Sequence, residues 1–448
     1  MPTALSTDLY ELTMAAGYFD AGTDRSATFE LSVRGLPPNR GYLVAAGIEP
    51  ALACLEEIRF TRPEIEYLRG LPQLGRVPAR FFDDYLSTFR FSGDVWAMTE
   101  GEPVFPDEPL VRVTAPVIEA QIVETALLSL VLFQTSVASR ASRMVRAAAG
   151  RPVYEFGARR AHGPEAGVLA GRAAFVGGCS GTSDVEAGLA YGVPLAGTMA
   201  HSWVMSHETE TEAFVRFVDL HGDRTVLLID TYDSERAVDR IAAARLAPFG
   251  VRIDSGDPEA EARRVRARLD ASGLQATKIF ASGDLDEQRI ARLVERRAPI
   301  DVFGVGTALS TASDAPALGG VYKLVEVERA GLAQPVLKLS PGKETYPGVK
   351  QVWRIAHGGK AAQDVIAGDH EPAPRHGRAL LGRVMRRGRR VRPAPAMREL
   401  REHALEAVGQ LPAEVLRLDG PAGYRVAVSE GLVRLTGDLQ RRTHALAG

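Results

Sequence analysis

The sequence predicts an α/β fold, with an irregular, barrel-like parallel sheet and a second α/β domain built from both chain ends. Two observations lead to this expectation. Short apolar runs, each followed by polar residues, alternate with amphipathic helical stretches through residues 152–307. The regions on either side contain hairpin-like apolar runs and proline-rich joints instead. Strands and helices that alternate at a spacing of about 25 residues favour parallel pairing through right-handed crossovers.

The repeating unit is clearest between residues 225 and 307. "TVLLIDTYD" contains an apolar run that ends at Ile229 and leads into the helical pattern of "DSERAVDRIAAARL". "VRIDSGD", "TKIFASGD" and "IDVFGVGT" predict further strands; after the first of them, Pro258 suits the first turn of a helix and Gly273 its end. Upstream, "PVYEFGARRAHG", "AAFVGGCSGTSD" and "VPLAGTMAHS" predict earlier members of the series. About seven such units suggest a barrel or a barrel-like sheet.

The length of 448 residues predicts two or three domains, since a domain has about 150 residues. We expect a barrel-like catalytic domain at 116–335. The flanking segments, 1–115 and 336–448, contain strand patterns such as "ATFELSV" and "PVLKLSPGKETYPGVKQVWRI". We therefore expect these two segments to fold together into a side domain.

The composition is that of an ordinary globular protein and points to a cytoplasmic location. The residues are 45% hydrophobic and 25% charged, and a formal charge of −2 gives no general attraction to nucleic acid or membrane. The apolar run "ALLSLVLF" falls far short of the ~20 residues of a membrane-spanning helix, and the first residues have no secretory pattern. We therefore expect neither a nucleic-acid partner nor a membrane partner.

Two other sequence features have ordinary structural explanations. Cys54 and Cys179 cannot make a disulfide framework or a four-ligand zinc site, and we expect Cys179 to be a small buried residue. The basic stretch "RHGRALLGRVMRRGRRVRP" has no interleaved aromatic residue on which a base could stack. It predicts a solvated arginine-rich face.

The polar residues cluster where the predicted strands end, which is the side on which active sites form in such folds. Many of them could instead be turn residues and helix caps. That alternative explains Arg159, His201 and Arg252 less well, because these residue types are poor caps. Their convergence on one rim predicts a shared anionic ligand.

The segment "VFGVGTALS" resembles a glycine-rich phosphate cradle. Gly304 and Gly306 would allow a close backbone approach, and Thr307 would begin the next helix. Leu309 stands at the third glycine position of the dinucleotide fingerprint, so that motif is absent, and a structural turn explains the glycines equally well. Asp254 and Asp284 suit a metal-bound diphosphate or ribose hydroxyls as well as helix caps.

Two histidines occur in "GTMAHSWVMSH". His201 and His207 are six residues apart, so they do not share a helical face, and a two-histidine metal clamp is absent. From the residues alone, either ring could be catalytic or structural.

Several of these motifs together resemble the nicotinate phosphoribosyltransferase family. They are "TDLYELTMAAGYF", "YEFGARRAHG", "GTMAHSWVMSH", "VRIDSGD", "GVGTALST" followed by "LGGVYKLVE", and "YPGVKQVWR". They occur in order from Thr7 to Arg354, and the resemblance is weak over the last ~90 residues. It implies the fold of a type II phosphoribosyltransferase.

The resemblance also implies a reaction. Nicotinate and 5-phosphoribosyl 1-diphosphate would give nicotinate mononucleotide and diphosphate, in NAD biosynthesis. ATP hydrolysis would be coupled to this transfer through a phosphohistidine, which the motif places at His201 and not at His207. Mg²⁺ would be needed for ATP and for the diphosphate, held mainly by substrate phosphates and not by a protein-only site.

Site residues follow from the matching motif positions. The resemblance implies catalytic roles for His201, Asp254 and Arg252. It implies contacts to nicotinate from Tyr10, Phe156, Ser183, Thr198 and Arg252, with the two aromatic rings on either side of the pyridine. It implies contacts to the phosphoribosyl group from Arg159, Asp230, Gly283, Asp284, Gly304, Gly306 and Thr307.

The resemblance implies a homodimer with shared active sites, because Tyr10 would come from the neighbouring subunit. Rival readings are an enzyme that acts on nicotinamide or quinolinate, a non-catalytic phosphosugar-binding protein, and a barrel aldolase or isomerase. A Schiff-base aldolase needs a lysine at a strand end, whereas Lys278 precedes the end of its strand. The chain also lacks the cysteine-rich C-terminal segment of some longer relatives, and with it any zinc site carried there.

Overall fold

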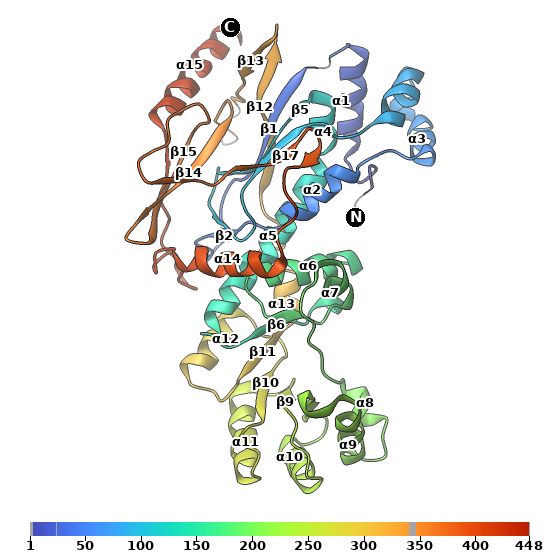
Figure 1. Cartoon of the computed structure of the whole chain (residues 1–448), viewed down its shortest axis with the longest axis vertical. Coiled ribbons are helices and arrows are strands. Elements are labelled where there is room, and N and C mark those ends of the chain that lie inside the picture. Colours follow the sequence, from blue (N-terminus) through green and yellow to red (C-terminus); the bar gives the residue numbers. More distant parts are fainter. Residues whose placement is uncertain (1–2, 24, 340–345, 448) are drawn as a thin grey trace. The chain divides into compact units, whose positions relative to one another are not determined.

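The chain divides into two compact units in the computed structural model, which describes residues 3–23, 25–339 and 346–447. We call residues 137–316 the central unit, and residues 1–136 together with 317–448 the terminal unit. Both contain helices and strands (Figure 1). The predicted α/β fold, with a second domain built from both chain ends, is confirmed.

The central unit contains a parallel six-stranded sheet in the order β7-β6-β11-β10-β9-β8. Its strands are β6 (Val153–Glu155), β7 (Gly181–Thr182), β8 (Val226–Leu228), β9 (Gly250–Ile253), β10 (Lys278–Ala281) and β11 (Val302–Val305). Since β7 and β8 are the two edges, the described sheet is an open part of a barrel wall. The predicted irregular barrel takes this partial form.

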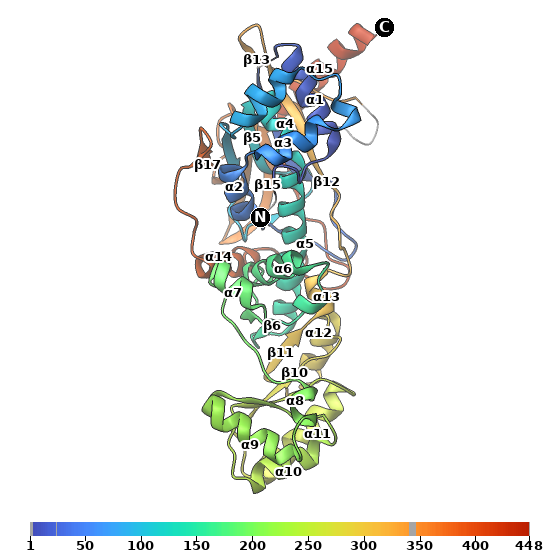
Figure 2. The ribbon, with the colours of Figure 1, turned by 90° about the vertical axis from the view of Figure 1, so that its right-hand side faces the viewer.

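The strands of this sheet are short and apolar because helices cover them. Val251, Ile253, Ile279, Phe303 and Val305 are at most 1% exposed, as expected for parallel strands buried on both faces. In the lower part of the central unit, α10 lies between α9 and α11, and α11 contacts β9 and β10 (Figure 2). The helices of this unit are α6 (Pro164–Val176), α7 (Val185–Tyr191), α8 (His201–Met205), α9 (Glu210–His221), α10 (Ser234–Ala243), α11 (Pro258–Ala271), α12 (Glu287–Glu295) and α13 (Thr307–Ser310), with short 3₁₀ turns at Ala158–Arg160 and Gly222–Arg224.

Aspartates begin three of these helices and explain part of the polar pattern at the strand ends. The carboxylates of Asp233, Asp257 and Asp286 accept hydrogen bonds from backbone N–H groups in the first turns of α10, α11 and α12. Pro258 is the first residue of α11, as predicted. The capping explanation therefore applies to these three aspartates, whereas those that directly follow the strands have other contacts.

Two of the upstream segments differ from the prediction. Residues 173–176, for which the sequence predicts a strand, form the last turn of α6 instead. The strand β7 is only Gly181–Thr182. The segment 193–202 has no strand, although Leu195 makes a single bridge with Thr182. Apolar runs of this length suit a buried helix as well as a strand, so periodicity alone could not separate them.

The terminal unit contains a seven-stranded sheet in the order β13-β12-β1-β5-β3-β17-β18, with antiparallel pairing at each neighbouring pair. The three strands from the beginning of the chain, β1, β5 and β3, lie in the middle and are flanked on both sides by strands from its end, so neither end could build the sheet alone. The strands are β1 (Ser26–Val33), β3 (Asp94–Ala97), β5 (Pro109–Pro116), β12 (Gly320–Arg329), β13 (Leu332–Pro335), β17 (Gly382–Arg386) and β18 (Arg389–Arg390).

Two smaller sheets and a set of helices complete the terminal unit. The order of the four-stranded sheet is β16-β14-β15-β19, and β2 pairs with β4. Their strands are β2 (Leu43–Val44), β4 (Pro103–Val104), β14 (Lys350–His357), β15 (Lys360–Gly368), β16 (Gly377–Ala379) and β19 (Val426–Val428). The helices are α1 (Leu9–Asp20), α2 (Ile48–Glu57), α3 (Arg62–Arg69), α4 (Val117–Ile122), α14 (Met397–Gly409) and α15 (Glu430–Ala447), together with a 3₁₀ turn at Pro72–Leu74 and a π-helical segment at Phe81–Leu86.

The division into units differs from the predicted domain bounds of 116 and 335. The helix α5 (Glu124–Ala147) contains the division at 136/137, and β12, which lies after the division at 316/317, pairs with β1. Residues 317–335 thus join a strand of the N-terminal region through backbone hydrogen bonds. A sequence search for repeating units cannot detect such a pairing.

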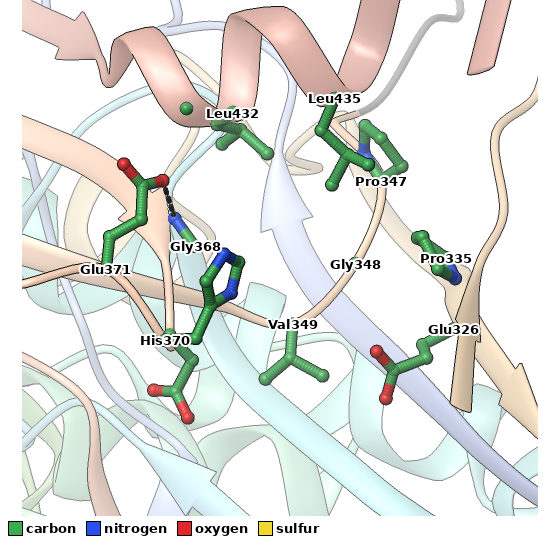
Figure 3. A pocket seen from close by; sticks show the side chains of 12 residues that line it. Glu326, Pro335, Pro347, Gly348, Val349, Gly368, His370, Glu371, Leu432 and Leu435 are labelled. Carbon is green, nitrogen blue, oxygen red and sulfur yellow. Dashed lines mark hydrogen bonds between the residues drawn. The ribbon is translucent and has the colours of Figure 1, made fainter. Parts of the chain in front are cut away.

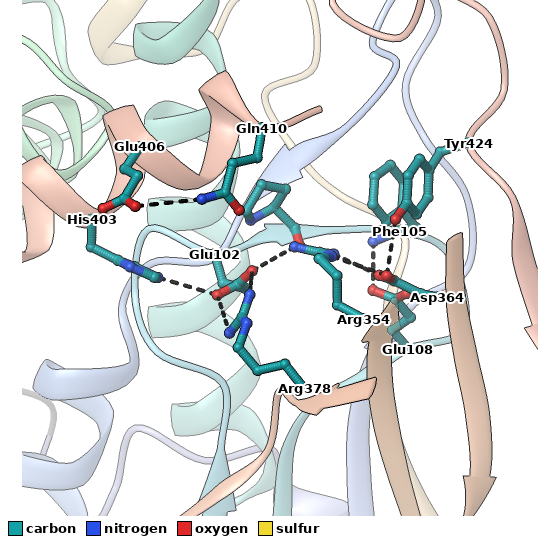
Figure 4. A network of polar contacts seen from close by, with 11 residues as sticks. Glu102, Phe105, Glu108, Arg354, Asp364, Arg378, His403, Glu406, Gln410 and Tyr424 are labelled. Carbon is teal, nitrogen blue, oxygen red and sulfur yellow. Dashed lines mark hydrogen bonds and ion pairs between the residues drawn. The ribbon is translucent and has the colours of Figure 1, made fainter. Parts of the chain in front are cut away.

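A buried ionic network holds the terminal unit together (Figure 4). Arg354 on β14 donates two hydrogen bonds to Asp364 on β15, at 2.6 and 2.9 Å, and also pairs with Glu102 before β4. Glu102, which is 1% exposed, also receives hydrogen bonds from Arg378 and contacts Nε2 of His403 on α14 at 3.2 Å. The network therefore connects strands and a helix that are up to 301 residues apart in the sequence.

The network also sets the charge of its carboxyl groups. Burial alone would raise the pKa of Glu102, but the hydrogen bonds from His403 and Arg378 and the charge of Arg354 lower it to about 2. Burial and the nearby charge of Asp364 raise the pKa of Glu108. The pKa values of these two carboxyl groups thus shift in opposite directions, because Arg378 and His403 bond to Glu102 directly whereas Glu108 lies beside the charge of Asp364.

The arginine-rich stretch of residues 375–393 is only partly the solvated face that we predicted. Arg390 pairs with Glu49 and Glu56, and Arg383 lies over the ring of Trp96 at 4.8 Å. Several of these arginines therefore bind the N-terminal part of the same unit. Both cysteines of the chain are buried, and no described helix is long and apolar enough to cross a membrane.

The lowered pKa of Glu102 gives a testable stability difference. Because the folded-state pKa lies below the usual value near 4.5, ionised Glu102 stabilises the fold above pH 4.5, and this stabilisation is lost as the pH falls toward 2. Glu102→Gln should lower the free energy of unfolding by about 3 kcal/mol at pH 7 and by clearly less at pH 3.5. Urea titrations at both pH values measure this. The exposed Glu414→Gln is the control, and an equal deficit at both pH values would contradict the account.

Candidate functional site

The predicted site residues of the central unit lie at the carboxyl ends of its parallel strands. Phe156 follows β6, Asp254 follows β9, and Gly306 comes one residue after β11. Because the strands are parallel and adjacent, these ends meet along one edge of the sheet. Residues far apart in the sequence therefore line a common space.

Two cavities that share Phe156, Arg159 and Arg252 open at this edge. The first has a volume of about 230 Å³ and is lined by Phe156, Arg159, Arg160, Arg252, Asp254, Ser282, Gly283, Asp284, Gly304, Gly306 and Thr307. The second has a volume of about 340 Å³ and is lined by Phe156, Ala158, Arg159, Ser183, Gly197, Thr198, Met199, Ala200 and Arg252. We call them the phosphate cavity and the ring cavity. Between them they contain most of the predicted site residues.

Arg252 is the central charged group of the two cavities. Its side chain is 12% exposed, and it donates to the carboxylate of Asp254 at 2.9 Å, to Ser282 at 3.2 Å and to the carbonyl of Met199 at 2.9 Å. Burial lowers the pKa of Arg252, while the charge of Asp254 raises it. Its Nε is buried without a hydrogen-bond partner. A guanidinium held in this way, with one donor unused, suits a carboxylate or phosphate ligand.

Asp230 supports this arrangement from the next strand. One of its carboxylate oxygens accepts hydrogen bonds from the backbone N–H of Asp254 at 2.8 Å and from the hydroxyl of Ser255 at 2.6 Å. Its other oxygen is buried without a partner. Asp230 lines neither cavity, so its observed contacts fix the turn that carries Asp254, and its predicted contact to the phosphoribosyl group stays a prediction.

The turn after β10 has an unusual backbone. Gly283 has φ +90°, and a Cβ atom there would lie 2.3 Å from the carbonyl oxygen of Asp254, so only glycine fits. The next residue, Asp284, has φ +44°. A non-glycine residue in the left-handed region is uncommon and often marks a functional site. This backbone places Asp284 in the wall of the phosphate cavity.

A side chain explains why position 304 is a glycine, while its predicted contact to the phosphoribosyl group stays a prediction. A Cβ atom at Gly304 would lie 2.6 Å from the ring of Phe156, so the glycine makes room for that ring. The backbone N–H of Phe156 donates to the carbonyl of Val305 at 2.7 Å. The ring is therefore fixed over β11, where it forms part of the wall of both cavities.

The two histidines of the 197–207 segment have different surroundings. Nδ1 of His201 lies 3.1 Å from the hydroxyl of Thr231, just after β8. The ring of His207 packs on Trp203, and its Nδ1 donates to the Trp203 carbonyl oxygen at 2.8 Å. His207 is therefore tied to the preceding helix α8, whereas His201 lies beside a residue that follows a strand end. Neither ring lines the two cavities.

Ser183 and Thr198 line the ring cavity, whereas Asp184, the residue after Ser183, does not. Ser183 is exposed, and its backbone N–H donates to the carbonyl of Glu155 at 2.9 Å. Asp184 accepts from the N–H of Ala187 at 2.8 Å and so caps α7. Asp184 is occupied by the helix, and Ser183 is the side chain that borders the cavity.

Tyr10 lies in the terminal unit, on α1, and its side chain is 46% exposed. Burial and a hydrogen bond to Glu124 raise its pKa. It is not among the residues that line the two cavities of the central unit. Its predicted contact with the pyridine ring stays a prediction.

Sequence reasoning missed several residues that the structure brings to the site. Ser282 and Thr231 both follow strand ends and hydrogen-bond to predicted site residues. Their positions in "ASGD" and "IDTYD", next to aspartates already singled out, were the available signal. Among the described residues, no group of three or more His, Cys, Asp or Glu side chains could hold a metal ion by itself.

The terminal unit has a larger cavity of about 490 Å³ (Figure 3). Glu326, His370, Glu371, Leu432 and Leu435 contribute to its wall. The carboxylate of Glu371 is already used, because it accepts from the N–H of Gly368 at 2.7 Å and from Ser429 at 2.6 Å. No predicted site residue lines this cavity.

Comparison with known proteins gives one consistent result. Three family profiles match: the nicotinate phosphoribosyltransferase N-terminal domain at 5–132, the nicotinate phosphoribosyltransferase family at 152–340, and the nicotinate phosphoribosyltransferase C-terminal domain at 374–436. The last match covers a region in which the resemblance of the motifs is weak.

Individual relatives agree with the profiles. Nicotinate phosphoribosyltransferase pncB2 of Mycobacterium tuberculosis is 45% identical over 453 residues, which cover 99% of this chain and 94% of that protein. The crystal structure of human nicotinic acid phosphoribosyltransferase is similar with a TM-score of 0.85 and 29% identity, over 97% of this chain and 99% of that one. A nicotinate-nucleotide pyrophosphorylase structure from Pyrococcus furiosus has a TM-score of 0.73 and 27% identity, over 91% and 95% of the two chains.

The contact between Gly304 and Phe156 can be tested by overpacking. Gly304→Ala should destabilise the protein by about 1 to 3 kcal/mol, because the new methyl group displaces the Phe156 ring. In a Phe156→Ala background the same change should cost little. Gly197→Ala, where a Cβ atom meets nothing within 4 Å, is the control. Thermal unfolding of the four variants measures the coupling, and equal costs of Gly304→Ala in both backgrounds would refute the contact.

Proposed function

The chain belongs to the nicotinate phosphoribosyltransferase family, and from that premise we propose that the ring and phosphate cavities are the place where it makes nicotinate mononucleotide. The substrates are nicotinate and 5-phosphoribosyl 1-diphosphate, and the second product is diphosphate. The single observation that carries the proposal is the largely buried Arg252, which lines both cavities and whose Nε has no hydrogen-bond partner.

In this proposal the two cavities hold the two halves of the product. The pyridine ring lies against Phe156, where stacking contributes about 0.5 to 1.5 kcal/mol beyond burial. Its carboxylate is held by Arg252, Ser183 and Thr198. The 5-phosphate lies beside Arg159 and the Gly306–Thr307 turn, where backbone N–H groups and a guanidinium can meet it.

The reaction is a substitution at C1 of the ribose. The lone pair of the pyridine nitrogen forms the new N–C1 bond, the C1–O bond breaks, and its electron pair leaves with diphosphate. The protein contributes by placing the two reactants at contact distance, since orientation can account for about 7 to 11 kcal/mol of a barrier. Asp254 and Asp284 stand at the phosphate cavity, where the leaving group forms.

We also propose Mg²⁺ as the ion that accompanies the diphosphate. Mg²⁺ is usually held by one or two carboxylates together with substrate phosphates, and Asp254 and Asp284 fit that pattern. When bound, the ion would neutralise charge on the departing diphosphate. No group of three or more described carboxylate, histidine or cysteine side chains offers a protein-only site.

ATP is proposed as the co-substrate that phosphorylates His201. The contact of Nδ1 with Thr231 leaves Nε2 free to attack the γ-phosphorus of ATP, with ADP as leaving group. The phosphorylated ring would add negative charge and acceptor oxygens near the strand ends. His207 is bound to Trp203 through its own Nδ1 and belongs to the helix packing.

Wild-type protein should release diphosphate from 5-phosphoribosyl 1-diphosphate only when nicotinate is present, and faster with ATP. His201→Ala should lose nicotinate-dependent ATP hydrolysis and keep a slow, ATP-independent transfer, because the cavities do not contain the imidazole. The matched variant His207→Ala should retain ATP hydrolysis. Labelled ATP followed by mapping of acid-labile phosphate identifies the residue. Label at His207, or an active enzyme without label, would overturn the assignment.

We propose that Ser183 and Arg252 make the enzyme select nicotinate over its amide, nicotinamide. Both can donate to the nicotinate carboxylate, and such a charge-assisted bond contributes about 1.5 to 3 kcal/mol, or roughly a 10- to 150-fold preference. A carboxylate at position 183 would repel nicotinate. Ser183→Asp should therefore shift kcat/KM toward nicotinamide, while the neutral Ser183→Asn should shift it less. Equal use of both substrates by wild type, or a strong acid preference in Ser183→Asp, would contradict this account.

A homodimer with shared sites is proposed because Tyr10 belongs to α1, in the terminal unit, and its ring is half-exposed and free to meet another chain. Mixed dimers of the inactive variants Tyr10→Ala and Arg252→Ala should recover part of the activity, since one of the two hybrid sites would have both residues. Each variant alone is the control. No recovery in heterodimers verified by mass would rule out sharing through Tyr10. A cytoplasmic location stays a prediction.

A further inference from the structure

Glu155 is a fully buried carboxylate at the end of β6, directly before Phe156. Its side chain is 0% exposed and lines neither cavity. Even so, it accepts hydrogen bonds from three separate segments: the N–H of Gly157, the hydroxyl of Thr182 at 2.6 Å and the hydroxyl of Ser310 at 2.5 Å. A buried carboxylate needs such donors because it has left water.

Each of the three segments carries a different part of the site. Gly157 connects Phe156 to Arg159, Thr182 precedes Ser183, and Ser310 ends the short helix that begins with Thr307. Gly157, Thr182 and Ser310 all donate to the same carboxylate. The ring of Phe156, the selectivity residue Ser183 and the phosphate turn therefore each lie one to three residues from one of these donors.

The packing around the carboxylate is tight. A Cβ atom at Gly157 would lie 1.9 Å from the hydroxyl oxygen of Ser310 and 2.7 Å from the carbonyl oxygen of Gly306, so only glycine fits there. A Cβ atom at Gly171 on α6 would lie 2.9 Å from the hydroxyl oxygen of Thr182. The segments cannot shift independently while these contacts are kept.

We propose that Glu155 is the positioning residue that fixes the pyridine, selectivity and phosphate segments relative to one another, without touching substrate. We call Glu155 and its three donors, Gly157, Thr182 and Ser310, the clamp. The hydroxyl of Thr182 also accepts from the N–H of Asp184 at 3.0 Å, so the hydrogen bonds extend from the clamp to the residue that caps α7. The backbone carbonyl of Glu155 accepts from the N–H of Ser183 at 2.9 Å. The main chain and side chain of one residue therefore hold the selectivity segment from both sides.

Ionised Glu155 fits this role better than the neutral form. Burial raises the pKa of Glu155 above its ordinary value, and the bonds from Ser310, Thr182 and Gly157 offset this rise only in part. A carboxylate can accept from all three donors, whereas a protonated carboxyl would need one of the hydroxyls to turn and accept instead. The clamp is complete only with the charged carboxylate.

The inference rests on the proposed function, and single-donor variants separate a positioning role from a merely structural one. Thr182→Val removes the donor of the selectivity segment and should raise KM for nicotinate about 3- to 10-fold, with less than a 2-fold change in the affinity for 5-phosphoribosyl 1-diphosphate. Ser310→Ala should weaken the binding of 5-phosphoribosyl 1-diphosphate about 3- to 10-fold and change KM for nicotinate less than 2-fold. Thr182→Ser keeps the hydroxyl and should restore wild-type KM. Calorimetric binding of 5-phosphoribosyl 1-diphosphate provides a readout that needs no turnover.

Glu155→Gln keeps the size of the side chain but cannot accept from all three donors. It should impair the binding of both substrates and make Ser310→Ala nearly without further effect in the double variant. The control is Thr225→Val, which removes a buried hydroxyl bonded to the carbonyl of Gly222 at the opposite end of β8. It should lower the melting temperature and leave both substrates unaffected.

The outcomes separate the two claims. If wild type binds 5-phosphoribosyl 1-diphosphate and turns over nicotinate, but Thr182→Val and Ser310→Ala change both substrates in parallel or neither, the positioning role is overturned. If wild type fails to turn over nicotinate, the proposed function is wrong. In that case calorimetry still tests the positioning role of Glu155. This role requires Ser310→Ala to weaken 5-phosphoribosyl 1-diphosphate binding more than Thr182→Val does.

Discussion

Parallel pairing of β6, β11, β10 and β9 is the constraint on which the rest of the site depends. The register places Glu155 opposite Val305, and Ala281 opposite both Ile253 and Phe303. The next residues of each strand, where the sheet ends, therefore lie side by side. If one strand took another place in the sheet, Arg252 would be separated from the 304–307 turn, although the local sequence would be unchanged.

The buried charges follow from this constraint. Arg252 sits within β9, so its guanidinium starts from a buried backbone and reaches the sheet edge, where Asp254 and Ser282 accept its hydrogen bonds. Nε of Arg252 and one oxygen of Asp230 remain buried and unpaired. Leaving such groups without partners costs stability, and functional sites tolerate that cost because the bound ligand can supply the missing partner. The terminal unit shows the contrasting case, since its ionic network around Arg354 is used for folding.

Motifs and strand ends were the predictable part of this protein. The α/β class, the parallel strands and most cavity residues follow from short local patterns such as "YEFGARR" and "RIDSGD". Glu155 was not singled out, because its partners Thr182 and Ser310 are 27 and 155 residues away, and no local pattern shows that their hydroxyls meet one carboxylate. The packing role of Gly304 was also not predictable from the sequence. A glycine beside a predicted phosphate turn suggests a ligand, and only the fold shows that the ring of Phe156 occupies the space.

The central claim is that the two cavities hold the two halves of nicotinate mononucleotide. A crystal structure of the wild-type protein with this nucleotide tests it most directly. The account predicts the pyridine ring stacked on Phe156, its carboxylate on Arg252 beside Ser183, and its phosphate between Arg159 and the Gly306–Thr307 turn. A nucleotide bound in the reverse direction, or in the cavity near Glu326 and His370, would contradict the account.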